Sequence, residues 1–213
     1  MYLSRLILNL RSRYVRTDLA RPYEMHRTLM QAFPDGLTEG VERVLYRLET
    51  QPRTGMPMLL VQSKLAPDWA QLPLSYLLAD PEWRNPQVKE VLLSFQAGQL
   101  LDFRLLANPT KRMSRSLPRG MDKSKRVGLY DPVEQLAWLD RKAEAHGFQV
   151  ISAVPNPRPP LKDRQHLLEF LSIQFDGLLR VIDPAQLSEA VVNGIGSAKA
   201  FGCGLLSLAP ARP

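Results

Sequence analysis

Apolar and polar residues alternate at every second position along residues 2–10, and this period predicts a β-strand. Pro22 then begins a helix that should end near Phe33, because the sequence PDG at 34–36 is a turn signal. Two strands, a short helix and another strand are predicted next, at 44–49, 58–63, 69–78 and 88–95. The order β-α-β-β-α-β is that of a ferredoxin-like domain.

The same order, with one strand more, repeats in the second half of the chain. Strands are predicted at 100–107, 148–154, 166–175, 178–182 and 205–208, and helices at 132–146 and 183–193. Asp176 and Gly177 are expected to form the turn of a hairpin. The expected fold is therefore α+β, with two tandem ferredoxin-like (RRM-like) domains at 1–97 and 98–213.

Composition supports a folded protein and narrows its class. Of the 213 residues, 45% are hydrophobic and 23% charged, as in ordinary globular proteins. No run reaches the roughly 18 apolar residues of a membrane span. The lone Cys203 and three scattered histidines give neither an internal disulfide nor a metal-ligand spacing. We expect a cytoplasmic protein that binds no membrane, no metal and no other cofactor.

The net charge of +7 is concentrated in one segment. From residue 104 to residue 126 there are eight basic residues and one acid, Asp122, so this segment carries the whole excess. The basic residues are Arg104, Lys111, Arg112, Arg115, Arg119, Lys123, Lys125 and Arg126. Such a patch is typical of proteins that bind a polyphosphate, although a solvated basic loop has the same composition.

A second basic stretch, VPNPRPPLKDRQH, is expected to interrupt the hairpin that follows the 148–154 strand. It contains Arg158, Lys162 and Arg164. Long insertions inside compact domains are usually functional or disordered, and the basic character shared with the first segment favours function.

The helix that begins at Pro22 carries the strongest candidate chemistry. At about 100° per residue, Met25, Leu29 and Phe33 form its buried stripe, and His26 and Tyr23 lie along one border of that stripe. An imidazole there can act as acid or base near neutral pH, with a phenol beside it. On helix geometry alone, a packing histidine remains the alternative. His146 and His166 are expected to be structural.

A glycine-rich stretch, NGIGSAKAFGCGLLSLAP, lies near the C-terminus. Its glycines are Gly194, Gly196, Gly202 and Gly204, placed around Lys199. Glycines let backbone amides approach a phosphate, but the stretch follows a helix and lacks the Gly-Lys-Ser/Thr of a nucleotide-binding loop. A helix cap at Gly194 with a tight strand entry is the structural alternative.

Together these stretches resemble the CasE family of CRISPR repeat-RNA endoribonucleases, subunits of the type I-E Cascade complex. The resemblance rests on MYLSRLILNL, DLARPYEMHRTLMQAF, RVLYRLE, LLVQS, FRLLANPTKR, KRVGLY, QLAWLDRKAEAHGF, LLRVIDPAQL and GIGSAKAFGCGLLSLA, which occur in family order along nearly the whole chain. The helix with Tyr23 and His26 and the glycine-rich end are its most specific parts.

The resemblance implies an enzyme that binds the stem-loop of a CRISPR repeat and cuts at the 3′ base of the stem without a metal. The 2′-hydroxyl would attack the adjacent phosphate and leave a 2′,3′-cyclic phosphate and a 5′-hydroxyl. His26 would be the general acid or base and Tyr23 its assistant. Segment 111–126 would contact the stem, and Arg158 and Lys162 the RNA near the cut.

Two other functions stay open from the sequence. A non-catalytic RNA-binding scaffold subunit of a CRISPR complex would use His26 only for packing. A general double-stranded RNA binder would show no preference for a hairpin. The expected partners are the repeat RNA hairpin and other Cascade subunits.

Overall fold

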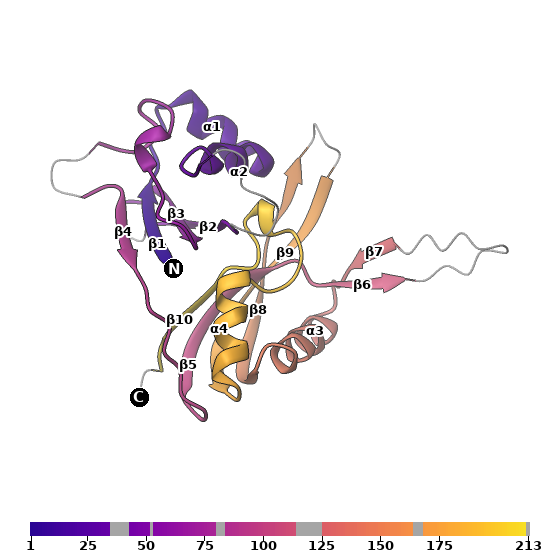
Figure 1. Ribbon diagram of the computed structural model, residues 1–213. Helices are drawn as coiled ribbons and strands as arrows, with labels where there is room; N and C mark the ends of the chain where they lie inside the picture. Colours follow the sequence, from indigo (N-terminus) through magenta and orange to yellow (C-terminus); the bar gives the residue numbers. More distant parts are fainter. Residues whose placement is uncertain (35–42, 52, 80–83, 114–124, 164–167, 212–213) are drawn as a thin grey trace.

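The computed structural model describes residues 1–34, 43–51, 53–79, 84–113, 125–163 and 168–211. Its two four-stranded antiparallel sheets lie one above the other in Figure 1. Each sheet has its own hydrophobic core. The segment between strands β4 and β5 joins them, and Leu93 and Phe95 of that segment pack against the second core. The division after residue 97 stays a proposal.

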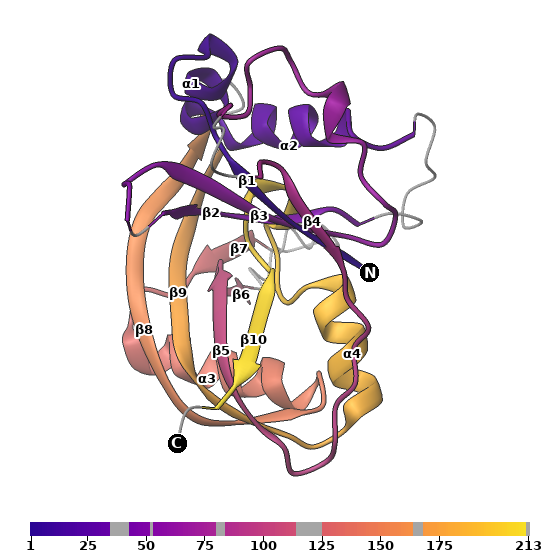
Figure 2. The same ribbon diagram turned by 90° about the vertical axis from the view of Figure 1, so that its left-hand side faces the viewer.

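The first sheet has the strand order β2-β3-β1-β4. Two helices cover one face of it (Figures 1 and 2). Its elements are β1 (Tyr2–Ile7), α1 (Arg13–Ala20), α2 (Pro22–Met30), β2 (Leu45–Thr50), β3 (Pro57–Ser63), the 3-10 turn η1 (Trp69–Gln71) and β4 (Gln87–Glu90).

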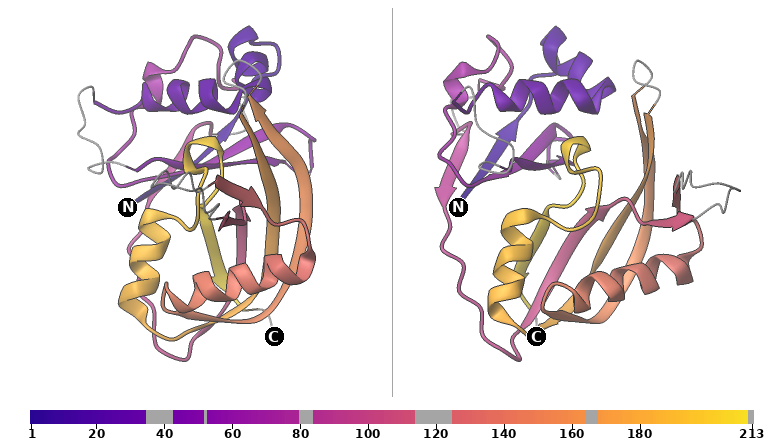
Figure 3. Two further views of the ribbon diagram at one scale, coloured as in Figure 1. Left: turned by 90° about the vertical axis from the view of Figure 1, so that its right-hand side faces the viewer. Right: turned by 45° about the vertical axis from the view of Figure 1, so that its right-hand side comes forward.

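The second sheet has the order β10-β5-β9-β8, which is the same ferredoxin-like arrangement of fourth, first, third and second strands. Helices α3 and α4 lie on one face of it (Figure 3). Its elements are β5 (Leu100–Ala107), α3 (Pro132–Glu144), β8 (Phe148–Asp163), β9 (Leu168–Val181), α4 (Pro184–Asn193), the 3-10 turn η2 (Lys199–Phe201) and β10 (Leu206–Pro210). A two-stranded arm, β6 (Thr110–Met113) and β7 (Lys125–Gly128), projects from it (Figure 1).

The fold class is confirmed, but some predicted elements are wrong. No element was predicted between the strand at 2–10 and Pro22, but residues 13–20 form helix α1. The helix predicted at 69–78 is only the turn η1, and the strand predicted at 88–95 is β4, which ends at Glu90.

The hairpin expected around Asp176 and Gly177 is also wrong, because β9 runs straight through both residues. A Cβ on Gly177 would lie 2.0 Å from the carbonyl oxygen of Ser152. Ser152 follows the first bulge of β8. The glycine therefore permits a close approach of two backbones rather than a turn.

The proline-rich stretch does not interrupt a hairpin; residues 154–163 are the outer half of β8. Strand β8 is an edge of its sheet, where a proline removes no ladder hydrogen bond on the open side. The hairpin of β8 and β9 consequently extends beyond its own sheet and passes beside α2 (Figures 1 and 3).

Candidate functional site

Helix α2 carries His26 and Tyr23 at the border of its buried face. Pro22 occupies the first turn, where its missing N–H costs nothing, and Met25 and Leu29 are buried in the first core. His26 is partly buried, whereas the Tyr23 side chain is 36% exposed. The sequence-predicted stripe and its border are thus present.

The imidazole of His26 has a ring nitrogen that no hydrogen bond among the described residues uses. Its Nδ1 is buried and has no hydrogen-bond partner among the described residues. Burial lowers the pKa of His26 below its usual value, because a cationic ring there would lose hydration. The ring is therefore neutral near pH 7, and a neutral imidazole can accept a proton.

The glycine-rich segment packs directly against α2 and β2. The ring of Phe201 lies 6.3 Å from the ring of Tyr23. The hydroxyl of Tyr46 donates to the carbonyl oxygen of Pro22 at 2.9 Å and lies 3.3 Å from that of Ala200. Tyr46 therefore connects the start of α2, the helix of His26 and Tyr23, with a segment about 150 residues later in the chain.

The glycines serve this packing. All four have positive φ, and a Cβ on Gly194 would lie 2.8 Å from Leu45, while one on Gly202 would lie 3.1 Å from Tyr46. The amides of Gly194, Gly202 and Gly204 donate to backbone carbonyls and are not aimed at a ligand. The Lys199 ammonium donates to the carbonyl oxygen of Asn193 at 2.8 Å.

A groove of about 580 Å³ separates the start of α2 from the outer half of β8. Arg21 and Pro22 line one side, and Pro160 and Lys162 line the other. The structure thus brings the helix of His26 and Tyr23 together with the second basic stretch predicted from the sequence. Lys162 is half exposed and pairs with Glu169 at 3.2 Å.

The first basic segment lies on the projecting arm. Lys111 and Arg112 are exposed on β6, Lys125 begins β7, and Arg126 is exposed on β7. Lys111 pairs with Glu134 of α3 at 2.6 Å. Three predicted contact residues, Arg115, Arg119 and Lys123, and also His166, lie outside the described residues.

A second hollow, of about 480 Å³, lies between the arm, the β8–β9 hairpin and the glycine-rich segment. Arg126 and Arg158 line it together with Tyr130, Phe170 and Phe201. The rings of Phe170 and Phe201 are 4.6 Å apart. Cationic and aromatic side chains in one hollow suit the phosphates and bases of a nucleic acid.

Sequence reasoning did not single out these aromatic residues or the polar partners of Arg158. Gln174 and Asp176 are polar positions at a spacing of two in β9, and they alternate with the buried Ile173 and Phe175. This alternation indicates that the two side chains share one face of a strand. The turn wrongly predicted at Asp176 and Gly177 ended the strand too early for that to be seen.

Within the described ranges, no three His, Cys, Asp or Glu side chains gather closely enough to hold a metal ion. In those same ranges, no helix is both long and apolar enough to cross a membrane.

Comparison with known proteins identifies relatives over the full chain. A family described as "CRISPR associated protein" matches residues 1–210. CRISPR-associated endoribonuclease Cse3 of Thermus thermophilus is 39% identical, covering 99% of this chain and 100% of the relative. The CRISPR system Cascade subunit CasE of Escherichia coli K12 is 32% identical, with the same coverage.

Solved structures agree with this result. The structure of T. thermophilus Cse3 bound to an RNA representing a pre-cleavage complex matches with a TM-score of 0.84, at 39% identity and over 98% of both chains. Sequence and backbone thus point to the same group of proteins. The chain belongs to the family of CRISPR-associated proteins that includes the endoribonuclease Cse3 and the Cascade subunit CasE.

Proposed function

We propose that this protein is a CRISPR-associated endoribonuclease that binds the repeat stem-loop of precursor CRISPR RNA and cuts it at the 3′ base of the stem. The names of its relatives and the RNA-bound structure of one of them support the substrate class. The non-catalytic scaffold is the alternative that the experiment below must exclude.

One observation carries the catalytic part of the proposal: a neutral histidine with an unpartnered ring nitrogen lies on the helix that borders the basic groove. His146 also has a buried Nδ1 without a partner, so the place of His26 on the helix beside the groove is what distinguishes it. A neutral imidazole in that place can accept a proton from bound RNA.

The reaction follows from these groups. His26 accepts the proton of the 2′-hydroxyl, and the 2′-oxygen attacks the adjacent phosphorus. The bond to the 5′-oxygen breaks, and the products are a 2′,3′-cyclic phosphate and a 5′-hydroxyl once that oxygen takes up a proton. Tyr23, one turn earlier on the same helix, assists by a hydrogen bond to the reacting phosphate or to the leaving oxygen. Cleavage needs no metal ion, because the base and the nucleophile are both present.

Positioning of the RNA falls to the basic residues. Arg158 and Lys162 act near the cut, and the arm residues Lys111, Arg112, Lys125 and Arg126 act on the stem. The ion pairs of Lys111 and Lys162 are exposed and worth at most about 1 kcal/mol each, so RNA phosphates can replace their acidic partners. Arg115, Arg119 and Lys123 complete the stem contact.

The product is expected to stay bound. A single well-positioned base raises the rate of cleavage by about two to four orders of magnitude, so the enzyme is expected to be slow. That rate suffices for an enzyme that cuts once and then serves, with its RNA, as a subunit of Cascade in the cytoplasm.

Replacement of His26 by Ala tests the proposal. Cleavage of a cognate repeat hairpin should fall at least about a hundredfold, while the dissociation constant in a gel-shift assay changes little. His146→Ala is the matched control, because that imidazole lies at the end of α3, on the second sheet. EDTA should leave the wild-type rate unchanged. Undiminished cleavage by the His26 variant would overturn the catalytic role of His26. Tight hairpin binding by the wild type without a cyclic-phosphate product, together with a lowered melting temperature of His26→Ala, would instead favour the scaffold.

A further inference from the structure

A row of polar side chains crosses the second sheet on the face opposite its helices. In β9, Ile173 and Phe175 are buried in the core, so the alternation of the strand directs Gln174 and Asp176 to the other face. Arg104 lies directly across from Asp176 on β5. Arg158 of β8 pairs with Ser172, so it lies diagonally from Gln174. The four side chains therefore form one continuous line.

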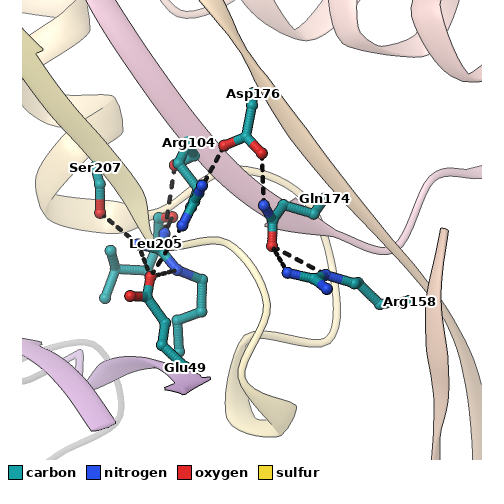
Figure 4. Close-up of polar contacts among 8 residues, drawn as sticks. Glu49, Arg104, Arg158, Gln174, Asp176, Leu205 and Ser207 are labelled. Atoms are coloured by element: carbon teal, nitrogen blue, oxygen red, sulfur yellow. Dashed lines mark hydrogen bonds and ion pairs between the residues drawn. The ribbon is translucent and has the colours of Figure 1, made fainter. Parts of the chain in front are cut away.

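Hydrogen bonds connect every member of this line (Figure 4). Arg158 donates from Nε and Nη2 to Gln174 Oε1, at 3.1 and 2.7 Å. Gln174 donates from Nε2 to Asp176 Oδ2 at 2.5 Å. Arg104 donates from Nε to Asp176 Oδ1 at 2.6 Å.

The carboxylate of Asp176 decides which way the amide of Gln174 points. An ionised carboxylate can only accept hydrogen bonds, so Asp176 accepts from the amide N–H of Gln174. The amide oxygen of Gln174 then faces Arg158 and accepts from it. Because Gln174 is neutral, it orients the guanidinium without cancelling its charge. A glutamate at this place would form an ion pair and reduce the attraction of Arg158 for an anion.

Nε and one N–H of Nη2 make the contact with Gln174, so Nη1 and the second N–H of Nη2 form the outer edge of the guanidinium. Arg158 lines the hollow that also contains Phe170 and Phe201. Parallel N–H groups on one planar edge match two oxygens of a phosphate. The arrangement presents a charged and already oriented phosphate ligand at that hollow.

The far end of the line is anchored in the interface between the two sheets. Arg104 Nη1 lies 3.9 Å from Glu49 Oε1 (Figure 4). The same oxygen lies 2.7 Å from Nη2 of the buried Arg47. Arg47 of β2 donates to the carbonyl oxygen of Leu205 at 3.1 Å and to the hydroxyl of Ser207 at 2.8 Å. The orientation of Arg158 is thereby connected to the buried Arg47 and to the interface between the two sheets.

From this geometry we propose that Gln174 and Asp176 are positioning residues, which hold Arg158 so that its outer edge binds a phosphate of the RNA substrate near the cut. The inference rests on the proposed function for the identity of the substrate. It adds that the line of polar side chains, and not Arg158 alone, creates the phosphate site.

A double-mutant cycle in the full-length protein tests the proposal. The variants are Arg158→Ala, Gln174→Met and Asp176→Asn, and each of the last two combined with Arg158→Ala. Gln149→Met is the matched control, because Gln149 is exposed at the other end of β8. Single-turnover cleavage of the repeat hairpin is the first measurement. Binding of a hairpin with a 2′-deoxy nucleotide before the cut, measured at several salt concentrations, is the second.

Gln174→Met and Asp176→Asn should each slow cleavage about tenfold in the wild-type background and change nothing in the Arg158→Ala background. Gln174→Met should also lower the slope of log affinity against log salt by about one, as Arg158→Ala does. Equal losses in both backgrounds would show a merely structural role and overturn the proposal, and so would an unchanged slope. If the wild-type protein does not cut, the proposed function fails, and the binding measurements alone decide the role of Gln174.

Discussion

At the scale of single residues, the feature that matters most is the protonation state of His26. Desolvation lowers the pKa of His26, so its ring is still mostly neutral at pH 6.5, where half of a solvated histidine is charged. The proposed base is thus ready in the free enzyme. For Arg158, the charge of the partner matters: Gln174 is neutral, so it orients the guanidinium without cancelling its positive charge.

The pH dependence of cleavage follows from this shift. As pH rises, the neutral fraction of His26 increases, so the rate should increase and then become constant. The midpoint of the rise in kcat/KM, which reports on the free enzyme, should lie below 6.5. Single-turnover rates measured at subsaturating enzyme concentrations between about pH 4.5 and 8, the range around a histidine pKa, give this value. A midpoint above the ordinary histidine value would contradict a buried, uncharged base.

At the scale of elements, strand β8 accounts for the shape of the candidate site. Its inner half belongs to the second sheet, and its proline-rich outer half extends beside α2 as an edge strand. The bulge between Val150 and Ser152 bends this strand against β9, and Gly177 is the residue that allows the close approach. One glycine therefore influences where Arg158 and Lys162 lie.

Gly177→Ala should be strongly destabilising. The new Cβ would lie 2.0 Å from the carbonyl oxygen of Ser152, so one strand must move. We expect a loss of about 3 kcal/mol or more in the free energy of unfolding, measured by urea denaturation. Gly128→Ala in β7 is the control, because its Cβ would make only ordinary contacts at 3.5 Å. Equal stability of the two variants would refute this explanation of Gly177.

At the scale of the whole molecule, the two sheets act as one support for the site. Tyr46 and Arg47 of the first sheet bond to Ala200, Leu205 and Ser207 of the second half of the chain. Burial lowers the pKa of Arg47, and the charge and hydrogen bond of Glu49 oppose this effect only in part. The groove between α2 and β8 depends on this interface, because its two walls come from different sheets.

Arg47→Met should weaken the molecule as a whole. It leaves Glu49 without its close partner and removes the donor to Leu205 and Ser207, so we expect a loss of about 3 kcal/mol in the free energy of unfolding. Arg180→Met, an exposed position on β9, is the control and should change stability by less than about 0.5 kcal/mol. The measurement is urea denaturation followed by tryptophan fluorescence. A loss no greater than that of the control would mean that the interface does not depend on Arg47.

The sequence by itself determined the periodic elements, the repeated ferredoxin-like order, the buried stripe of α2 and the clustering of positive charge, because each follows from local spacing. It also contained the residues of the candidate site. Only the tertiary structure decided that Gly177 lies within a strand, that the prolines lie on an edge, and that Gln174 and Asp176 reach Arg158. These facts depend on which strands become neighbours, and long-range pairing leaves little trace in the local pattern.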